Sequence, residues 1–274
     1  MIIVNLKGGL GNQMFQYACG RALSLRNNDI LSLVRSEYRG DVVRTFSLAN
    51  FTIKGETMAP DAVPKFSRLF AHLKQKLTRN FYVGFDSNIL KKHGQTVYLD
   101  GYFQSEKYFQ DFAAEIRQDF SLAVPFEGQA AEIAHTIKND PNAVSLHVRR
   151  GDYLTHPDFG GIVTREYYER AVSHIRKSLP SAKFYVFSDD IDWCRVTLPL
   201  GNNATFVSQP ELKDYEEMIL MSQAHHHIIA NSSFSWWGAW LGNNPNKIVI
   251  APSKWSNLHE NWYNDIIPSS WTRL

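Results

Sequence analysis

The sequence predicts an α/β protein built around parallel β-sheets. The chain opens with a short apolar strand over residues 1–6, which runs into a glycine-rich turn and then into a helical pattern. The second half alternates strand-like and helix-like segments along its whole length. Such alternation predicts parallel sheets, whose ligands bind at the carboxyl ends of the strands. With 274 residues, the chain is long enough for one large domain or two of ordinary size.

Apolar residues recur at helical spacing after the first turn, so we expect a helix over about 12–25. These residues are Phe15, Ala18, Cys19, Ala22 and Leu23. Asn27 and Asn28 follow them and favour the end of this helix.

The middle of the chain, about 50–125, is less regular, with a strand and turn expected at 97–103 and a helix at 105–120. In the second half we expect strands at 144–148, 183–187, 204–207, 227–230 and 247–251. Helices are expected there at 129–138, 165–179, 192–197, 212–224 and 234–241. A boundary at 121–128, which holds Pro125, predicts domains 1–125 and 126–274, with the last segment packing back on the first domain.

Composition excludes several classes of protein. There are 29 basic and 27 acidic residues, a balance that argues against general nucleic-acid binding. The two cysteines, Cys19 and Cys194, are too few for a disulfide framework or a cysteine-based metal site. No stretch approaches the roughly 18 apolar residues that span a bilayer, and the N-terminus lacks the pattern of a signal peptide. We therefore expect a cytoplasmic protein, and peripheral membrane attachment stays open.

Residues 65–80 form a basic segment with an apolar stripe at helical spacing. Five lysines and arginines and no acidic residue lie within it. Such a helix either packs on its own domain or lies on an anionic membrane surface.

The segment 147–153, HVRRGDY, lies where a buried strand ends. His147 and Arg149 are two residues apart, so in a strand they face the same way. The guanidinium groups of Arg149 and Arg150 offer forked donors that match phosphate oxygens. The alternative is an arginine pair that forms salt bridges with Asp152 or with another loop.

The segment 231–237, NSSFSWW, follows a strand and opens a helix. Ser232 or Ser233 can cap that helix, and its N-terminus can also bind a diphosphate. Trp236, Trp237 and Trp240 are expected in the core.

Residues 8–13, GGLGNQ, form a glycine turn that matches neither a Walker motif nor a complete dinucleotide fingerprint. It is either a tight strand-to-helix turn or a loop that points Asn12 at a ligand. Asp189 and Asp190 follow another strand, where they either cap the next helix or hold Mg²⁺ or Mn²⁺. Residues 225–227 are three histidines, of which at most two share a face, so no metal site is expected there.

Four segments together resemble the α-1,2-fucosyltransferase family of bacteria and animals: 8–18, 145–153, 186–194 and 228–241. The resemblance extends over nearly the whole chain. It implies a GT-B architecture, in which two Rossmann-like domains face each other across a cleft. It also implies inverting transfer of L-fucose from GDP-β-L-fucose to the 2-hydroxyl of a terminal β-galactose, without a metal ion or other cofactor.

The resemblance also implies roles for single residues. Arg149 would bind the β-phosphate, with Arg150 in support, and His147 and Glu217 would meet guanine. The phosphate and ribose contacts would come from Ser232, Ser233 and Phe234, and the donor contacts of the first domain from Gly11 and Asn12. Asp152 is the candidate general base, and its rival role is to hold one of the arginines.

The implied acceptor is a galactose-terminated glycan, such as a lipid-linked O-antigen or surface-polysaccharide unit at the inner face of the membrane. Residues 65–80 would suit that location. Two other functions remain as alternatives. One is a metal-dependent sugar-nucleotide or phosphoryl-transfer enzyme that uses Asp189 and Asp190. The other is a non-catalytic glycan-binding protein with aromatic stacking platforms.

Overall fold

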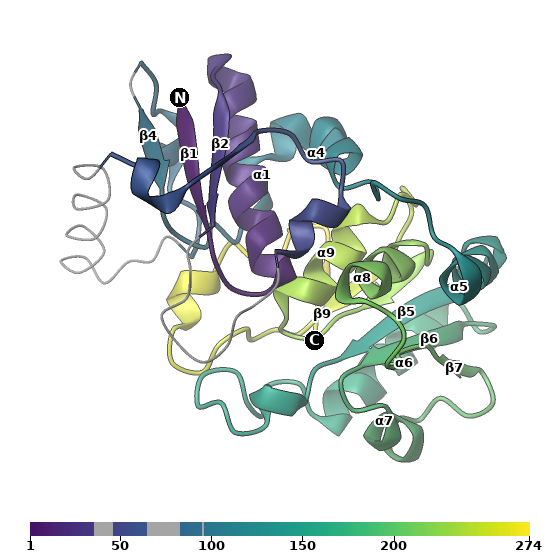
Figure 1. The fold of residues 1–274 in the computed structure, drawn as a ribbon. Coiled ribbons are helices and arrows are strands. Elements are labelled where there is room, and N and C mark those ends of the chain that lie inside the picture. The colour runs from purple at the N-terminus through teal and green to yellow at the C-terminus, as the bar shows by residue number, and fades with distance from the viewer. Residues whose placement is uncertain (36–45, 65–82, 95) are drawn as a thin grey trace. The chain divides into compact units, whose positions relative to one another are not determined.

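The computed structural model describes residues 1–35, 46–64, 83–94 and 96–274 (Figure 1). The expected basic helix at 65–80 lies outside these residues. The chain divides into two compact units. Unit 1 comprises Met1–Val124 and Trp262–Pro268, and unit 2 comprises Pro125–Asn261 and Ser269–Leu274. Within the described ranges, no helix is long and apolar enough to cross a membrane.

Unit 1 is built on a four-stranded parallel sheet in the order β3-β2-β1-β4. Its strands are β1 (Ile2–Leu6), β2 (Leu31–Arg35), β3 (Glu56–Met58) and β4 (Val97–Leu99). The chain starts in the middle of the sheet, moves outward through β2 and β3, and returns to the other side of β1 with β4. The parallel sheet confirms the α/β prediction for this half.

Helix α1 (Leu10–Asn27) packs on β1 and β2. Its end confirms the prediction from the paired asparagines, because Asn28 takes the left-handed conformation, with a φ of 51°, that closes a helix. Gly20 brings this helix against the sheet: a Cβ atom there would lie 2.1 Å from Cγ2 of Val4. Only a glycine fits such a close approach of helix and strand.

The predicted helix at 105–120 is wrong in its first half. Two 3-10 turns, Glu106–Tyr108 and Gln110–Phe112, precede a short helix α4 (Ala113–Asp119). The backbone of Phe109 is not helical, with φ and ψ of −136° and 4°. This break lets two consecutive aromatic rings enter the core, that of Tyr108 beside Phe85 and that of Phe109 beside Phe15. The short helix α3 (Ser87–Leu90) lies earlier in the same region.

Unit 2 is built on a six-stranded parallel sheet in the order β10-β9-β8-β5-β6-β7. Its strands are β5 (Ala143–Val148), β6 (Lys183–Ser188), β7 (Ala204–Phe206), β8 (His226–Ile228), β9 (Val249–Ala251) and β10 (Thr272–Arg273). Its helices are α5 (Gly128–Asn139), α6 (Arg165–Ser178), α7 (Ile191–Thr197), α8 (Asp214–Ser222) and α9 (Ser233–Leu241). The five predicted strands and five predicted helices of this half are confirmed to within two or three residues at each end.

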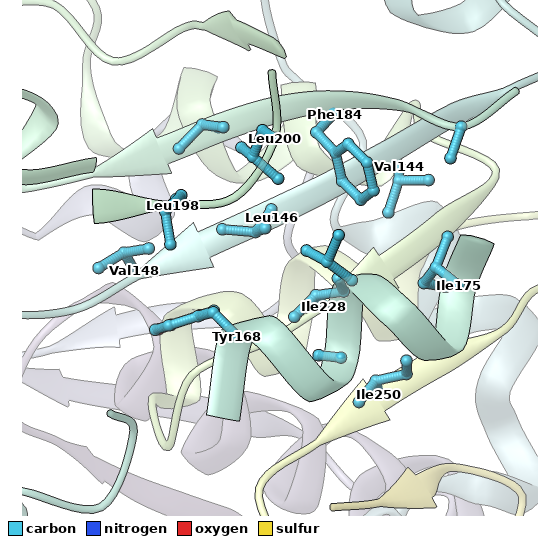
Figure 2. Packing of buried hydrophobic residues seen from close by; sticks show 14 of the residues in the cluster. Val144, Leu146, Val148, Tyr168, Ile175, Phe184, Leu198, Leu200, Ile228 and Ile250 are labelled. Atoms are coloured by element: carbon cyan, nitrogen blue, oxygen red, sulfur yellow. The ribbon is translucent and has the colours of Figure 1, made fainter. Parts of the chain in front are cut away.

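Alternation along β5 sends its side chains to the two faces of this sheet. Val144, Leu146 and Val148 face α6 and form the core with residues such as Tyr168 and Ile175 (Figure 2). Ser145 and His147 face the opposite side, where α8 and α9 lie. Trp236, Trp237 and Trp240 of α9 are buried and pack with one another and with Trp271, which confirms their predicted place in the core.

The strand order reverses at β5. From β5 the chain proceeds to β6 and β7 on one side, and then crosses to β8 and β9 on the other. In open α/β sheets, ligands bind at the carboxyl ends of the strands at such a switch point. The carboxyl ends of β5 and β8 are therefore where a ligand of unit 2 is expected.

Candidate functional site

Two arginines follow β5 directly and lie among carboxylates. Arg149 donates through Nη2 to Oδ1 of Asp152 and lies with Nη1 3.2 Å from Oδ2 of Asp189. Arg150 donates through Nε to Oδ2 of Asp190 at 2.9 Å, and its guanidinium stacks over the Trp193 ring at 4.0 Å. The salt-bridge interpretation of this pair is thus confirmed. A guanidinium carries five N–H donors, so these ion pairs do not use up its capacity to bind an anion.

Asp189 and Asp190 are both used by groups of the protein. Oδ1 of Asp189 accepts from the backbone N–H of Arg150 at 2.8 Å. Asp190 caps α7 by accepting from the N–H of Trp193 at 3.1 Å, which confirms the predicted cap. The hydrogen bond from Arg150 also holds the pKa of Asp190 below its usual range. Among the residues that the structure describes, no three His, Cys, Asp or Glu side chains gather as a metal site.

The carboxyl end of β8 leads into the N-terminus of α9. Ser232 is the N-cap, and its hydroxyl accepts from the N–H of Phe234 at 3.3 Å. This confirms the capping interpretation and assigns it to Ser232, while Ser233 is the first helical residue. Asn231 fixes the approach to the helix, because its amide donates to the carbonyls of Phe159 and Trp255. The positive end of the α9 dipole therefore lies at the switch point.

His147, near the end of β5, packs against the first turn of α9. Its ring lies 5.6 Å from that of Phe234, and its side chain is only 5% exposed. Burial, helped by the charge of Arg149, lowers the pKa of His147 to about 3, so the imidazole is neutral. Its Nδ1 is buried and has no hydrogen-bond partner among the described residues. A neutral aromatic ring with an unsatisfied polar atom suits one wall of a pocket for a heteroaromatic base.

Glu217 reaches the same sheet from α8. Burial is the main cause that raises the pKa of Glu217 to about 7, and the charges of Asp214 and Asp189 add to it. A hydrogen bond with Ser208 acts in the opposite direction. Glu217 thus lies near enough to Asp189 for their charges to interact, so it belongs to the same side of the site as the arginines.

Gly11 and Asn12 lie in unit 1, in the first turn of α1 at the carboxyl end of β1. Oδ1 of Asn12 accepts from Nε2 of Gln104 at 2.8 Å, and Gly8, with a φ of +81°, leaves room for the Asn12 amide. Nearby, Nζ of Lys7 donates to Asp100 at 2.7 Å. This turn is a polar cluster at the switch point between β1 and β4.

Unit 2 therefore brings together most of the residues expected at the site, and Gly11 and Asn12 belong to the other unit. The unit 2 set is His147, Arg149, Arg150, Asp152, Glu217, Ser232, Ser233 and Phe234. Sequence analysis missed Trp193, which stacks on Arg150, and the role of Asp189 as a partner of Arg149. The available signal in the sequence was an aromatic residue three positions after the acidic pair that follows a strand.

Comparison with known proteins identifies the family. The family model described as glycosyl transferase family 11 matches residues 1–274. The chain belongs to glycosyl transferase family 11. An α-1,2-colitosyltransferase of Escherichia coli is 32% identical over 295 residues, which cover 100% of this chain and 99% of the relative. The O-antigen biosynthesis glycosyltransferase WbnK of Escherichia coli is 30% identical, with 91% of this chain and 93% of the relative covered.

More distant relatives agree with this assignment. The galactoside 2-α-L-fucosyltransferase Sec1 of Mus musculus is 26% identical, with 88% of this chain and 64% of the relative covered. Among solved structures, the NodZ α-1,6-fucosyltransferase soaked with GDP-fucose has a TM-score of 0.51 and 14% identity, with 88% and 91% of the two chains covered. At that identity the likeness concerns the fold alone. This chain and the NodZ structure share the GT-B fold class, with two Rossmann-like α/β units.

Proposed function

We propose that this glycosyltransferase transfers L-fucose from GDP-β-L-fucose, with inversion, to the 2-hydroxyl of a terminal β-galactose. The observation that carries the proposal is the arrangement at the β5–β8 switch point. There, the neutral buried ring of His147 packs on Phe234 in the first turn of α9, and the charge of Arg149 lies near enough to act on His147. A base pocket next to an anion site is what a nucleoside diphosphate sugar requires.

The charges of the site support cleavage of a sugar–phosphate bond. As the bond between the anomeric carbon and the phosphate oxygen breaks, negative charge develops on the β-phosphate of the departing GDP. Preorganised donors that meet this charge lower the barrier. Arg149 and the α9 N-terminus would supply them, and Arg150 is held in place by Asp190 and Trp193. The transfer thus needs no metal ion in this proposal.

The acceptor hydroxyl attacks the anomeric carbon from the opposite face, and its proton goes to a base. Asp152 is the candidate base, since it lies in the 3-10 turn that follows the arginines and its side chain is 52% exposed. Its ion pair with Arg149 supports the rival role of holding that arginine. The two roles differ in what removal of the Asp152 charge does to GDP affinity.

Glu217 is proposed to meet the guanine edge from α8. A carboxylate accepts two hydrogen bonds side by side, which matches the paired N–H donors of guanine. Its raised pKa means that GDP binding would weaken as the carboxyl becomes protonated below about pH 7.

The transferred sugar has a second candidate, colitose. The relative at 32% identity over the full chain is named a colitosyltransferase, whereas the named fucosyltransferases are 26% identical or less. The acceptor is proposed to be a galactose-terminated unit of an O-antigen or surface polysaccharide, in keeping with the name of the WbnK relative. Such an acceptor is lipid-linked, which would place the enzyme at the inner face of the membrane.

The test is a transfer assay with purified protein and lactose in the presence of EDTA. GDP-β-L-fucose and nucleotide-activated colitose are supplied in separate reactions, and products are analysed by mass spectrometry with linkage analysis. Fucose on the galactose 2-hydroxyl would support the donor, the linkage and metal independence together. Product from colitose alone would replace the donor, and product only without EDTA would favour the metal-dependent alternative. If the folded protein gave no product and did not bind GDP, the nucleotide-sugar site would be refuted.

A further inference from the structure

The loop after Arg149 carries a continuous stack of aromatic rings. The Arg149 guanidinium lies 5.3 Å from the centre of the Tyr153 ring. Tyr153 stacks on Phe159, with ring centres 5.2 Å apart and planes 22° apart. His156 also stacks on Phe159, at 4.8 Å and 28°. We call Tyr153, His156 and Phe159 the aromatic shelf.

The loop that carries the shelf is held in one conformation. Gly160 donates its N–H to the carbonyl of His156 at 2.8 Å, and a Cβ atom on it would lie 2.7 Å from the carbonyl oxygen of Tyr153. The loop is therefore closed on itself so tightly that only glycine fits at this position.

Two neighbouring segments also anchor this loop to the body of unit 2. Asp158 is buried, accepts from the Ser256 hydroxyl, and accepts from the N–H of Leu258 at 2.8 Å. Asn231 donates to the carbonyl of Phe159 at 3.2 Å, and Asn257 donates to that of Gly160 at 2.8 Å. A partly exposed aromatic surface that is fixed in this way is preorganised for a ligand.

The shelf also has a defined polar edge. Nδ1 of His156 accepts a hydrogen bond from the N–H of Asp158 at 3.1 Å. In the neutral imidazole the proton is therefore on Nε2, which makes that atom a hydrogen-bond donor. The His156 side chain is exposed. Flat apolar rings next to an outward N–H donor match a pyranose, which has an apolar C–H face and a rim of hydroxyl oxygens.

We propose that the aromatic shelf binds a pyranose ring of the acceptor glycan. This inference rests on the proposed function, because it takes the leaving phosphate to lie at Arg149. The anomeric carbon is then one oxygen atom from that phosphate, and the acceptor hydroxyl must approach the same carbon. The aromatic shelf, which lies in the loop that follows Arg149, is thus in a position to contact the acceptor. Asp152, the candidate base, lies in the same loop as the shelf.

The test separates acceptor binding from donor binding. His156→Ala removes the Nε2 hydrogen-bond donor and one ring of the aromatic shelf. Phe159→Leu removes the central ring, and Thr155→Ala is the matched control in the same loop. For each variant we would measure acceptor KM and donor KM in the transfer assay, and GDP affinity by calorimetry. Hydrolysis of the nucleotide sugar without acceptor provides a further donor-side readout.

We expect acceptor KM to rise about tenfold in His156→Ala and at least as much in Phe159→Leu, with donor KM, GDP affinity and hydrolysis within about twofold of the wild type. Thr155→Ala should match the wild type. Unchanged acceptor KM in His156→Ala would overturn the inference. Weaker GDP binding in that variant would also overturn it, since the rings would then serve Arg149. Absence of transfer in the wild-type protein would instead count against the proposed function.

Discussion

The change in the free energy of unfolding between about pH 7 and about pH 5 tests whether His147 and His227 are neutral imidazoles in the folded protein. His147 is buried beside Phe234, and His227 is fully buried with Nδ1 2.8 Å from the Ser145 hydroxyl. Burial lowers the pKa of both, and the charges of Arg149 near one and of Lys247 near the other act in the same direction. In the unfolded chain each has a pKa of about 6.5.

The direction of the pH effect on stability follows from proton uptake. Below about pH 6.5 the unfolded chain binds two protons that the folded chain does not, so the free energy of unfolding decreases as the pH is lowered. This contribution is fully present above pH 6.5 and is lost progressively below it. Each group loses about 1.4 kcal/mol per pH unit below its unfolded pKa, which gives about 4 kcal/mol for the pair at about pH 5.

Glu217 opposes this loss. Burial raises its folded pKa to about 7, whereas the unfolded pKa is about 4.3. Between these values the folded state binds the extra proton, so acidification stabilises it, by about 2 kcal/mol from pH 7 to pH 5. For His147, His227 and Glu217 together, the wild-type protein should therefore lose only about 2 kcal/mol. Glu217→Gln removes the compensation and should lose about 4 kcal/mol.

The assay is urea unfolding at closely spaced pH values, followed by tryptophan fluorescence. Of the seven tryptophans, Trp262 belongs to unit 1 and the other six belong to unit 2, so the signal reports the unit that holds His147, His227 and Glu217. His227→Gln in the Glu217→Gln background should halve the loss. An equal acid loss in wild type and Glu217→Gln would refute the opposing role of Glu217. A pH-independent free energy of unfolding in Glu217→Gln would refute the neutral burial of both histidines.

Three further changes test the site and the fold. Arg149→Ala should reduce kcat by at least about a hundredfold, because the charge that develops on the phosphate is no longer met; near-normal turnover in the transfer assay would remove this residue from the site. Asp152→Asn should abolish transfer while GDP affinity measured by calorimetry persists or rises, because the variant frees Arg149 of a competing carboxylate; a marked fall in GDP affinity would favour the positioning role. Gly20→Ala should destabilise unit 1 by about 1–3 kcal/mol in thermal unfolding, because the added methyl group would meet Val4; an unchanged midpoint would contradict the close packing of α1 on β1.

The elements that sequence analysis predicted well are those with a local signal. The strands and helices of unit 2 follow from alternating apolar segments separated by turn residues. By contrast, β2 and β3 were not foreseen, since β2 has five residues and β3 only three, with weak patterns of their own. They form because β1 provides an edge with which β2 can pair, and β2 in turn provides one for β3. Tertiary pairing of this kind leaves little trace in a short segment.

The same distinction applies to the candidate site. The capping roles of Ser232 and Asp190 were foreseen because a cap acts within two or three residues of its own position. The partnership of Arg149 with Asp189 joins residues 40 apart and depends on β5 pairing with β6. The carboxyl-end rule nevertheless placed both residues at one sheet edge, so the region of the site was predictable and its ion pairs were not.

The ion pairs bear on how an anion would enter this site. Two guanidinium groups lie among three carboxylates, those of Asp152, Asp189 and Asp190. The arginines keep free N–H donors, but a diphosphate would bind there more favourably if it took the place of one carboxylate, since like charges at contact distance repel. Asp189 and Asp190 also accept backbone N–H groups, whereas Asp152 is the more exposed partner on a short turn. Asp152 is therefore the carboxylate that a phosphate would displace. The Asp152 carboxylate released from Arg149 in this way would be free to face the acceptor hydroxyl. Donor binding and release of the candidate base would then be a single event at Arg149.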